Sequence, residues 1–181
     1  MTELPIICPR VTLRRLEPGD LRAFQAYRHD PEVGRYQGWE PESDDAATAF
    51  LTECQTATLL AHGRWCQVGI GLNPNARLIG DIGIYLAQDG AHAELGFSLA
   101  RAHQGQGLAT EAVQAALTWV FTATQVHRVV GVTDARNEAS ARLLARLGMR
   151  LEKTMQAKFR GQMCTEHQYA VLRAQAALPQ L

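Results

Sequence analysis

Gln104-Gly105-Gln106-Gly107-Leu108-Ala109 is the stretch of this sequence that decides its fold, because it separates a predicted strand from a long predicted helix. The strand is expected over residues 93–99, and the helix is rich in Ala, Leu, Val and Trp and runs to about Thr122. Glycines let a backbone approach a ligand closely, and the N–H groups at a helix N-terminus make an anion site suited to a pyrophosphate. The same glycines could serve only the backbone angles of a strand-to-helix turn. The stretch therefore indicates either a phosphate cradle or a structural turn, and the rest of the chain must decide.

The segments on either side of the glycines predict one mixed sheet covered by helices. Strands are expected over residues 12–16, 65–72, 78–86, 93–99, 128–133, 150–155 and 166–172. Helices are expected to begin near Leu21, Ser43, Leu108 and Asn137, and the second of them runs to about Ala61. Asn73-Pro74-Asn75 has the residue types of a hairpin turn, so the two strands beside it should pair antiparallel. The order of elements predicts an α/β fold with a mixed, largely antiparallel sheet of about seven strands and about four helices.

Length and composition predict one globular domain that spans residues 1–181. The 181 residues suit a single domain of ordinary size, and 46% hydrophobic with 20% charged residues is typical of a folded protein. No apolar stretch approaches the roughly 20 residues of a membrane-spanning helix, and residues 1–10 lack the pattern of a signal peptide. We therefore expect a cytoplasmic protein that does not act at a membrane.

The net charge is zero, but the two halves of the chain differ in sign. Residues 1–100 hold 8 basic and 13 acidic side chains, whereas residues 101–181 hold 10 basic and 5 acidic ones. This asymmetry fits an anionic ligand on the second half and a cationic ligand near the first, although solvated charges would explain it equally well. A neutral chain without interleaved basic and aromatic residues does not fit a nucleic-acid-binding protein.

The residue types that bind metals show no spacing that predicts a metal site. Cys8, Cys54, Cys66 and Cys164 form no C-x-x-C pair, and the six histidines form no H-E-x-x-H motif. We expect the four cysteines to be buried, reduced thiols without a catalytic role.

Two nucleotide-binding motifs can be compared with the glycine stretch. A P-loop requires G-x-x-x-x-G-K-S/T, and no lysine follows the glycines, so hydrolysis of nucleoside triphosphates is excluded. A dinucleotide site requires a third glycine where Thr110 stands and an acidic residue about 20 positions later. The nearest carboxylate at a strand end, Asp134, comes later than that, so a nicotinamide-dependent enzyme is a weaker alternative.

The glycine stretch and its neighbours resemble the GNAT family of N-acetyltransferases. Gln104, Gly107 and Ala109 fill the acetyl-CoA motif R/Q-x-x-G-x-G/A of that family. Further agreement comes from Val11-Thr12-Leu13-Arg14, Asp30-Pro31-Glu32-Val33, Ala93-Glu94-Leu95-Gly96-Phe97, His127-Arg128-Val129, Asn137-Glu138-Ala139-Ser140 and Leu147-Gly148-Met149. These segments are similar to the RimJ/RimL-like branch, which is typified by the ribosomal-protein-alanine acetyltransferases. The resemblance covers nearly the whole chain.

The resemblance implies a GNAT fold and suggests which residues bind acetyl-CoA. In that fold the sheet is splayed in its middle, and the strand that holds Phe97, Ser98 and Leu99 offers its backbone to the pantetheine arm. Backbone N–H groups hold the pyrophosphate, here at Gln104, Gly105, Gln106, Gly107, Leu108, Ala109 and Thr110. The asparagine that matches Asn137 hydrogen-bonds the cofactor arm, and Asn137 also has the position of a helix N-cap. The resemblance implies no metal.

Acetyl transfer requires a neutral amine as nucleophile. Amines with pKa values near 8 to 10 are mostly protonated at neutral pH, so a carboxylate should accept a proton, directly or through water. Glu94 is the first candidate for this base, because strand alternation can point it into the cleft, and Glu166 is the second; either could instead be a surface carboxylate. Many relatives use a tyrosine to protonate the departing thiolate, but that position holds Leu144 here. Ser140 matches a serine of the RimL-like branch and is the candidate general acid, unless its hydroxyl only bonds the helix backbone.

The resemblance implies transfer of the acetyl group of acetyl-CoA to a primary amine by direct attack on the thioester. The acceptor is expected to be a protein N-terminal α-amine or a small-molecule amine. Acetyl-CoA and this acceptor are the expected partners, and homodimers are common among the relatives. A non-catalytic module that binds acyl-CoA is the main alternative, followed by the nicotinamide-dependent enzyme.

Overall fold

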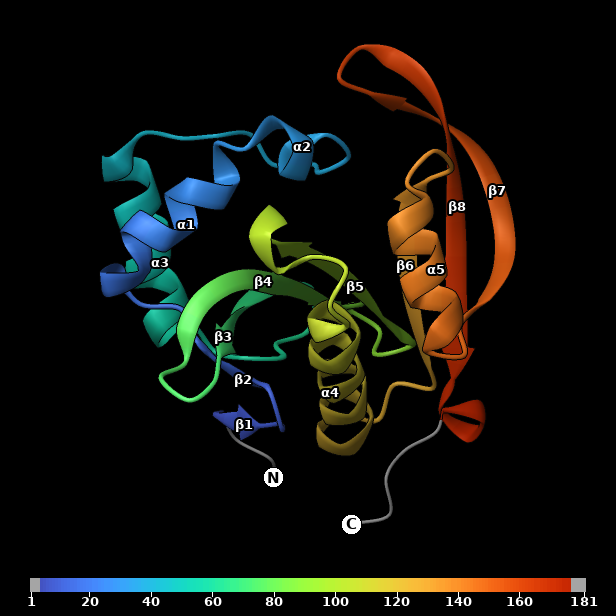
Figure 1. Cartoon of the computed structure of the whole chain (residues 1–181). Coiled ribbons are helices and arrows are strands. Elements are labelled where there is room, and N and C mark those ends of the chain that lie inside the picture. The colour runs from blue at the N-terminus through green and yellow to red at the C-terminus, as the bar shows by residue number, and fades with distance from the viewer. Residues whose placement is uncertain (1–3, 177–181) are drawn as a thin grey trace.

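One mixed sheet runs through the described part of the molecule (Figure 1). The structure is a computed structural model and describes residues 4–176. In spatial order the eight strands are β1 (Ile6–Ile7), β2 (Val11–Arg15), β3 (Trp65–Leu72), β4 (Arg77–Leu86), β5 (His92–Leu99), β6 (Arg128–Asp134), β8 (Gln162–Leu172) and β7 (Arg150–Phe159). Neighbouring strands are antiparallel except for the parallel pair β5 and β6. The expected mixed, largely antiparallel α/β fold is confirmed.

The parallel pair β5–β6 is short and opens into a gap in the middle of the sheet. Only the first three residues of β5, from His92 to Glu94, pair with β6. On its other side β5 pairs with β4 from Ala93 to Leu99. Residues 95–99 of β5 therefore have no strand partner on the β6 side, and their backbone groups there can pair with another extended group.

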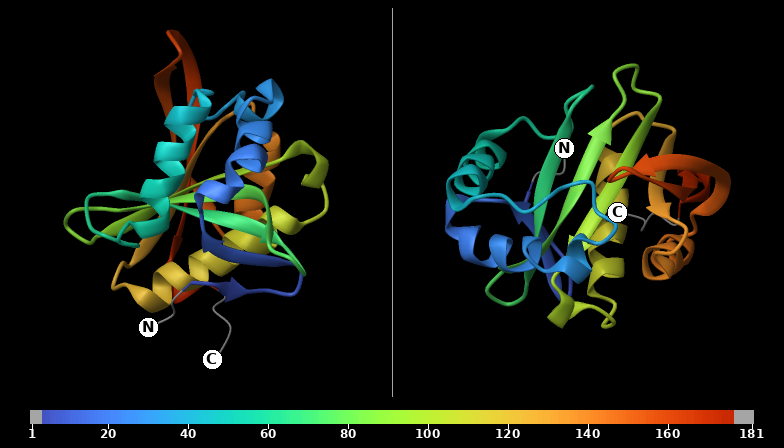
Figure 2. Two further views of the ribbon diagram at one scale, coloured as in Figure 1. Left: turned by 90° about the vertical axis from the view of Figure 1, so that its left-hand side faces the viewer. Right: turned by 90° about the horizontal axis from the view of Figure 1, so that it is seen from above.

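Helices cover both faces of the sheet (Figures 1 and 2). One face carries α1 (Leu21–Arg28), α2 (Pro31–Gly34) and α3 (Asp44–Thr56), whereas α4 (Leu108–Ala123) and α5 (Glu138–Arg146) pack on the other. Two of the helix starts follow the predicted caps, because Ser43 accepts a hydrogen bond from the N–H of Ala46, and Asn137 accepts one from the N–H of Ser140.

The second long helix is shorter than its sequence suggests. It was expected to reach about Ala61, and this is wrong, because α3 ends at Thr56. Ala57 has an extended ψ of 145°, and the following Leu59 and Leu60 pack against the sheet core. These apolar residues continue the helical pattern of the sequence although the chain has already left the helix.

The C-terminal hairpin is longer than expected. β7 and β8 extend beyond the predicted residues 150–155 and 166–172 and join through Arg160 and Gly161, whose φ angles are +48° and +81°. Two residues with positive φ make the tight turn that suits a twisted hairpin. The hairpin rises above α5 and bends toward α2 (Figure 1). The outer part of β7, Thr154-Met155-Gln156-Ala157-Lys158-Phe159, continues to alternate polar and apolar residues, so the predicted strand ended too early along its own pattern.

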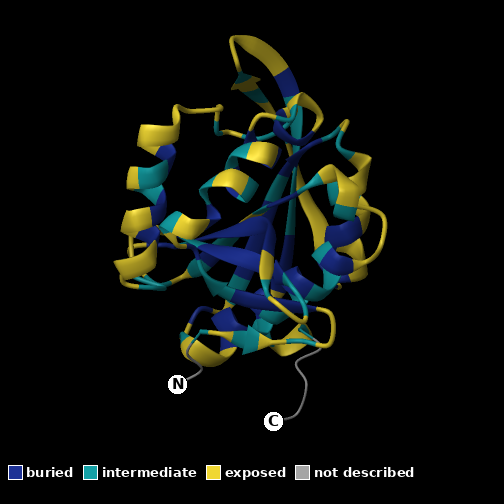
Figure 3. Cartoon of the chain, turned by 60° about the vertical axis from the view of Figure 1, so that its left-hand side comes forward, coloured by how far each residue is buried: buried dark blue, intermediate teal, exposed yellow. Residues whose placement is uncertain are grey.

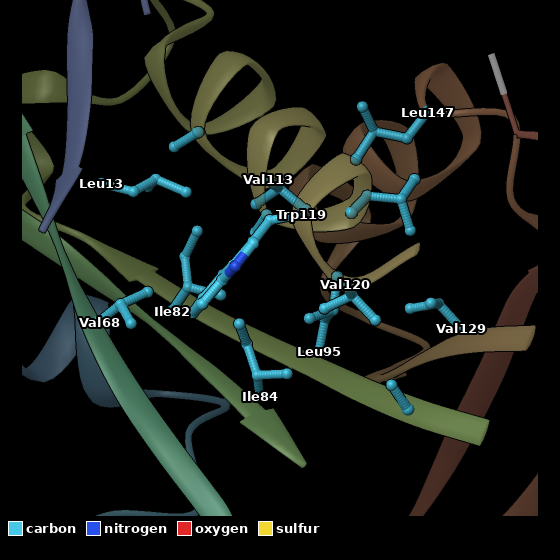
Figure 4. Packing of buried hydrophobic residues seen from close by; sticks show 14 of the residues in the cluster. Leu13, Val68, Ile82, Ile84, Leu95, Val113, Trp119, Val120, Val129 and Leu147 are labelled. Atoms are coloured by element: carbon cyan, nitrogen blue, oxygen red, sulfur yellow. The ribbon is translucent and has the colours of Figure 1, made fainter. Parts of the chain in front are cut away.

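The larger of the two cores lies between α4 and the sheet. Figure 4 shows Val113, Trp119 and Val120 of α4 packed against Ile82 and Leu95 of the sheet. Burying such a side chain contributes about 1.5–3 kcal/mol, so this layer fixes α4 on the strands. Buried residues follow the sheet, and exposed ones lie on the outer sides of the helices (Figure 3).

The four cysteines have free thiols, and three of them are buried. Burial raises the pKa of Cys54 to about 12, so this thiol stays protonated. Within residues 4–176, no helix is long and apolar enough to cross a membrane.

Candidate active site

A cavity of about 490 Å³ lies beside the gap between β5 and β6, bounded by the start of α4 and by α5. Residues proposed to bind the cofactor line it together: Phe97, Ser98, Leu99, Gln104, Gly105, Gly107, Leu108, Ala109, Thr110 and Asn137. The proposed general acid, Ser140, also lines the cavity. Of the remaining site residues, Gln106, Glu94 and Glu166 are not among its lining residues in the part of the chain that the structure describes.

The glycine stretch turns sharply into α4 at the wall of this cavity. Gly105 and Gly107 have φ angles of +73° and +77°, which glycine adopts far more readily than other residues, and Gly107 is the N-cap of α4. The N–H groups of the first helical turn lack intrahelical partners and carry the positive end of the helix dipole. Leu108, Ala109 and Thr110 belong to this turn and line the cavity. The start of α4 is therefore an anion site. The two roles considered for the glycines, the backbone angles of the turn and the close approach of an anion, are both met here.

Arg10 braces the glycine turn from the far end of the chain. Its Nη1 donates to the carbonyl of Gln106 at 2.8 Å, and its Nε donates to the Glu111 carboxylate at 2.7 Å. The backbone N–H of Arg10 binds the same carboxylate at 2.8 Å. Arg10 thus ties the turn to the first turn of α4. Sequence reasoning missed it, because about 100 residues separate the partners and an exposed arginine gives no local signal.

Two glutamine side chains of the stretch hold the loop rather than the cavity. The amide of Gln104 donates to the carbonyl of Leu99 at 2.8 Å, which joins the end of β5 to the loop. The amide of Gln106 donates to the carbonyl of Ala102 at 3.0 Å and so closes the loop on itself. The backbone N–H of Gln104, which was expected to hold the pyrophosphate, donates to the carbonyl of Arg101 at 3.2 Å, so binding of an anion is left to the backbone N–H groups that follow it.

Asn137 and Ser140 face the cavity from the start of α5. The Asn137 Oδ1 accepts a hydrogen bond from the Ser140 N–H at 3.2 Å, so the asparagine caps the helix, and its amide nitrogen has no bond with other described residues. The Ser140 hydroxyl likewise makes no hydrogen bond with the described residues, and it can donate to a group in the cavity. Leu144 is only 1% exposed and belongs to the core, so this position supplies no proton donor.

The charge of the cavity wall suits an anion. The acidic and basic side chains that line it are those of Glu32, Arg35, Arg142 and Arg146, together with His103. Among the described residues no group of three or more side chains is arranged to hold a metal ion. Three guanidinium groups around one cavity favour a phosphorylated ligand.

The segment of residues 34–39 roofs the end of β5 and is held by the C-terminal hairpin. Arg160 donates to the carbonyls of Gly34, Gln37 and Trp39 at 3.3, 3.4 and 3.2 Å. The Gln37 amide in turn donates to the carbonyl of Phe97 at 3.0 Å. One guanidinium on the hairpin thus fixes the segment that contacts the open edge of β5.

A buried ion pair supports this roof from beneath. The Asp81 carboxylate is 1% exposed and accepts from Tyr27, from Arg28 at 2.7 Å and from Gln67 at 2.9 Å. Burial and the adjacent Asp81 raise the pKa of Tyr27 well above its ordinary value, so its hydroxyl remains a donor. The Arg28 guanidinium lies 4.2 Å from the centre of the Trp39 ring, a cation–π distance. The pair therefore joins α1 to β4 and to the roof.

Glu94 lies on β5 and Glu166 on β8, with β6 between the two strands, and neither residue lines the cavity. Both carboxylates are partly buried, and neither forms an ion pair or a side-chain hydrogen bond with the other described residues. Burial raises the pKa of Glu94 above its ordinary value, His92 opposes this effect, and Glu166 adds to it. The raised pKa means that Glu94 binds a proton more readily than an exposed glutamate does.

A family model described as the acetyltransferase (GNAT) domain matches residues 10–150. The chain is also 34% identical over 146 residues to the uncharacterised N-acetyltransferase YoaA of Bacillus subtilis strain 168, covering 79% of this chain and 81% of that protein. The matched segment holds the glycine turn, β5 and α5, which together line the cavity.

Solved structures share the fold at low sequence identity. Spermidine N-acetyltransferase from Vibrio cholerae, in complex with CoA and spermine, has a TM-score of 0.78 and 22% identity, covering 91% of this chain and 96% of that one. RimL, a ribosomal L7/L12 α-N-protein acetyltransferase in complex with CoA, has a TM-score of 0.79 and 19% identity, covering 94% and 98%. At these identities the likeness concerns the fold.

Proposed function

The chain belongs to the GNAT acetyltransferases, and from this premise we propose that it transfers the acetyl group of acetyl-CoA to a primary amine. The family implies an acetyl-CoA-dependent N-acetyltransferase, which agrees with the enzyme class expected from the sequence. A non-catalytic binding module and a nicotinamide-dependent enzyme gain no support from the family match. The observation that carries the proposal is the anion site at the start of α4 in the same cavity as the unpaired edge of β5.

The residues present fit acetyl-CoA. The first-turn N–H groups of α4 would hold the pyrophosphate, and the three cavity arginines would neutralise phosphate charge. The backbone edge at Phe97, Ser98 and Leu99 has no strand partner on the β6 side and would pair with the amides of the pantetheine arm, at carbonyls where the side chains of Gln37 and Gln104 now bond Phe97 and Leu99. The Asn137 amide would bond the same arm. The bound group would supply an acetyl thioester.

Two kinds of side chain assist the transfer in this proposal. Glu94 accepts the proton of the amine, directly or through water, with Glu166 as the second carboxylate within electrostatic reach. Ser140 donates a hydrogen bond from its hydroxyl to the departing thiolate and so stabilises its charge, because it lines the cavity and has no other partner among the described residues. Neither step forms a covalent bond to the protein.

A ligand panel tests the proposed cosubstrate. A ligand that binds only the folded state at about 100 times its Kd stabilises that state by roughly 2.7 kcal/mol, which raises the unfolding temperature by several degrees. We expect this shift with acetyl-CoA and CoA and none with NAD or ATP, as measured by thermal unfolding. A larger shift with NAD, or no shift with CoA, contradicts the proposal. A thiol-release assay with primary amines then tests turnover.

Gly107→Val is expected to weaken acetyl-CoA binding by roughly 10- to 100-fold. A β-branched residue at φ +77° costs about 1–3 kcal/mol, and relaxing this strain turns the first-turn N–H groups away from the cavity. Titration calorimetry measures the Kd. Gly148→Val is the matched control, because Gly148 has φ +79°, ends α5 and does not line the cavity. Its variant should lose stability and keep the affinity, and equal losses of affinity in both variants would rule out a special role for the glycine turn.

The acceptor class is a further part of the proposal. We keep a protein N-terminal α-amine and a small-molecule amine as the two acceptor classes, because the two CoA-bound proteins of the same fold are named for one acceptor of each kind. Membership of the RimJ/RimL-like branch rests on the sequence segments that resemble it. We expect a homodimer from that resemblance, and a cytoplasmic location is supported by the four free thiols.

A further inference from the structure

Trp65 presents an exposed indole at one end of the sheet. It is the first residue of β3, precedes the part of β3 that pairs with β2, and is 55% exposed. It is the one aromatic residue among the large hydrophobic side chains that stay exposed in residues 4–176. Its ring centre lies 5.5 Å from that of Tyr85 on β4, so the two rings form an aromatic pair. An exposed indole that packs on a second ring offers a rigid apolar surface against which a ligand can pack.

Strand register places this pair beside the proposed base. Trp65 pairs with Tyr85, and Tyr85 pairs with Glu94, so the three side chains form a row across β3, β4 and β5 on one face of the sheet. Asp81 and Ser98 are paired on this same face of the sheet, and Asp81 bonds Arg28 of α1. This is the face that α1 covers, and it is opposite to the face that α4 covers. The row therefore lies on the face where an acceptor can approach the gap in the sheet.

Two glycines connect the row to the cofactor cavity. The Trp65 ring leans over Gly83, where a Cβ would lie 3.3 Å from two ring atoms. Gly83 pairs with Gly96 of β5, about 5 Å away, and a Cβ built on Gly96 meets no atom within 4 Å. On the same face of β5, Gly96 lies between Glu94 and Ser98, and Ser98 lines the cavity. The open space above Gly96 thus borders the indole, the carboxylate and the cavity.

We propose that this space is the acceptor site, and that the Trp65 indole, supported by Tyr85, forms the wall against which the body of the acceptor packs. The inference rests on the proposed acetyl transfer. The reacting amine lies over Gly96, where Glu94 accepts its proton, and the rest of the molecule lies along the indole. The acceptor is accordingly a primary amine carried on an apolar group, because a polar body would gain little from the aromatic wall.

Two small amines, used as test ligands, distinguish an acceptor site with an aromatic wall from a site that binds only the amino group. Wild-type protein should bind and acetylate 2-phenylethylamine roughly 10- to 100-fold better than ethanolamine, since only the former buries an apolar body. Trp65→Ala should remove most of this preference by weakening 2-phenylethylamine while leaving ethanolamine nearly unchanged. Ile7→Ala, which shortens another exposed apolar side chain on β1, is the matched control and should keep the preference. The measurements are kcat/KM and the Kd of each amine for the protein saturated with CoA, which cannot react.

The variant Gly96→Val tests whether the amine binds in the open space above Gly96. Valine suits a strand and fits the backbone at Gly96, whose φ is not positive, so the variant should fold and keep its affinity for acetyl-CoA. Its side chain would fill the open space, and binding of both amines should fall by at least about tenfold. If acetyl-CoA still binds, unchanged amine binding in this variant would overturn the inference. The absence of a wild-type preference for 2-phenylethylamine would overturn it as well. Loss of acetyl-CoA binding by the wild type would instead overturn the proposed function.

Discussion

Glu94→Gln is expected to lower kcat/KM for acetyl transfer by between about 10² and 10⁴, the usual contribution of a general base. The carboxylate is partly buried, has no ion-pair partner among the described residues and borders the open space above Gly96. Affinity for acetyl-CoA should not change, because Glu94 does not line the cavity. Steady-state rates over a pH series measure the effect, and the fall in rate at low pH that comes from protonation of Glu94 should disappear.

Glu166→Gln is the matched variant, since it removes the second carboxylate and should cause a smaller loss. A larger loss than in Glu94→Gln would transfer the role of base to Glu166.

Stability gives an independent check on Glu94. Because its pKa is raised in the folded state, its contribution to stability is complete below the pKa of the unfolded carboxyl and is lost as the pH rises through the folded value. Glu94→Gln should therefore raise the unfolding temperature at pH 8 and leave it unchanged near pH 4.

Asp81→Ala is expected to destabilise the fold by about 3–5 kcal/mol, the usual effect of leaving a buried charge without its partner. Arg28 would lose its carboxylate, and Tyr27 and Gln67 would lose their acceptor. For a chain of this size the unfolding temperature should fall by roughly 6 to 20 °C, as measured by calorimetry.

Glu138→Ala is the control for the buried pair, because its bond to Arg142 is exposed and contributes less than about 1 kcal/mol. The double variant Arg28→Met with Asp81→Leu should recover much of the stability, since no unpaired charge stays buried. If Asp81→Ala and Glu138→Ala cost the same, the pair beneath the roof is not a structural support.

Local sequence signals were sufficient for the elements around the cavity. The glycines and the apolar face of α4 could be read from adjacent residues, as could the N-cap at Asn137. The predicted hairpin at Asn73-Pro74-Asn75 is confirmed for the same reason, because turn chemistry is local.

Contacts between distant segments could not be predicted. Arg10 at the glycine turn and Arg160 on the roof each bond backbone carbonyls across about 100 residues or more, and any exposed arginine has the same local appearance. The acceptor row was also hidden, because Trp65 and Tyr85 are 20 residues apart in the sequence and meet Glu94 only through strand register. The end of α3 was missed where Leu59 and Leu60 serve the core of the sheet instead of the helix.

The short parallel pairing of β5 with β6 also bears on how the chain folds. On one side of it, β1 to β5 pair only with strands adjacent in sequence, and on the other side β6, β7 and β8 form a separate antiparallel unit. Strands β3 to β5 follow one another through short turns, as do β7 and β8, so these hairpins need little loop closure. The parallel pair must instead bring together two strands separated by the whole segment that contains α4, and only three residue pairs hold it. We therefore expect the hairpins to form early and β5 to join β6 late, so that binding of the cosubstrate in the cavity beside this junction reports that the two parts of the sheet have come together.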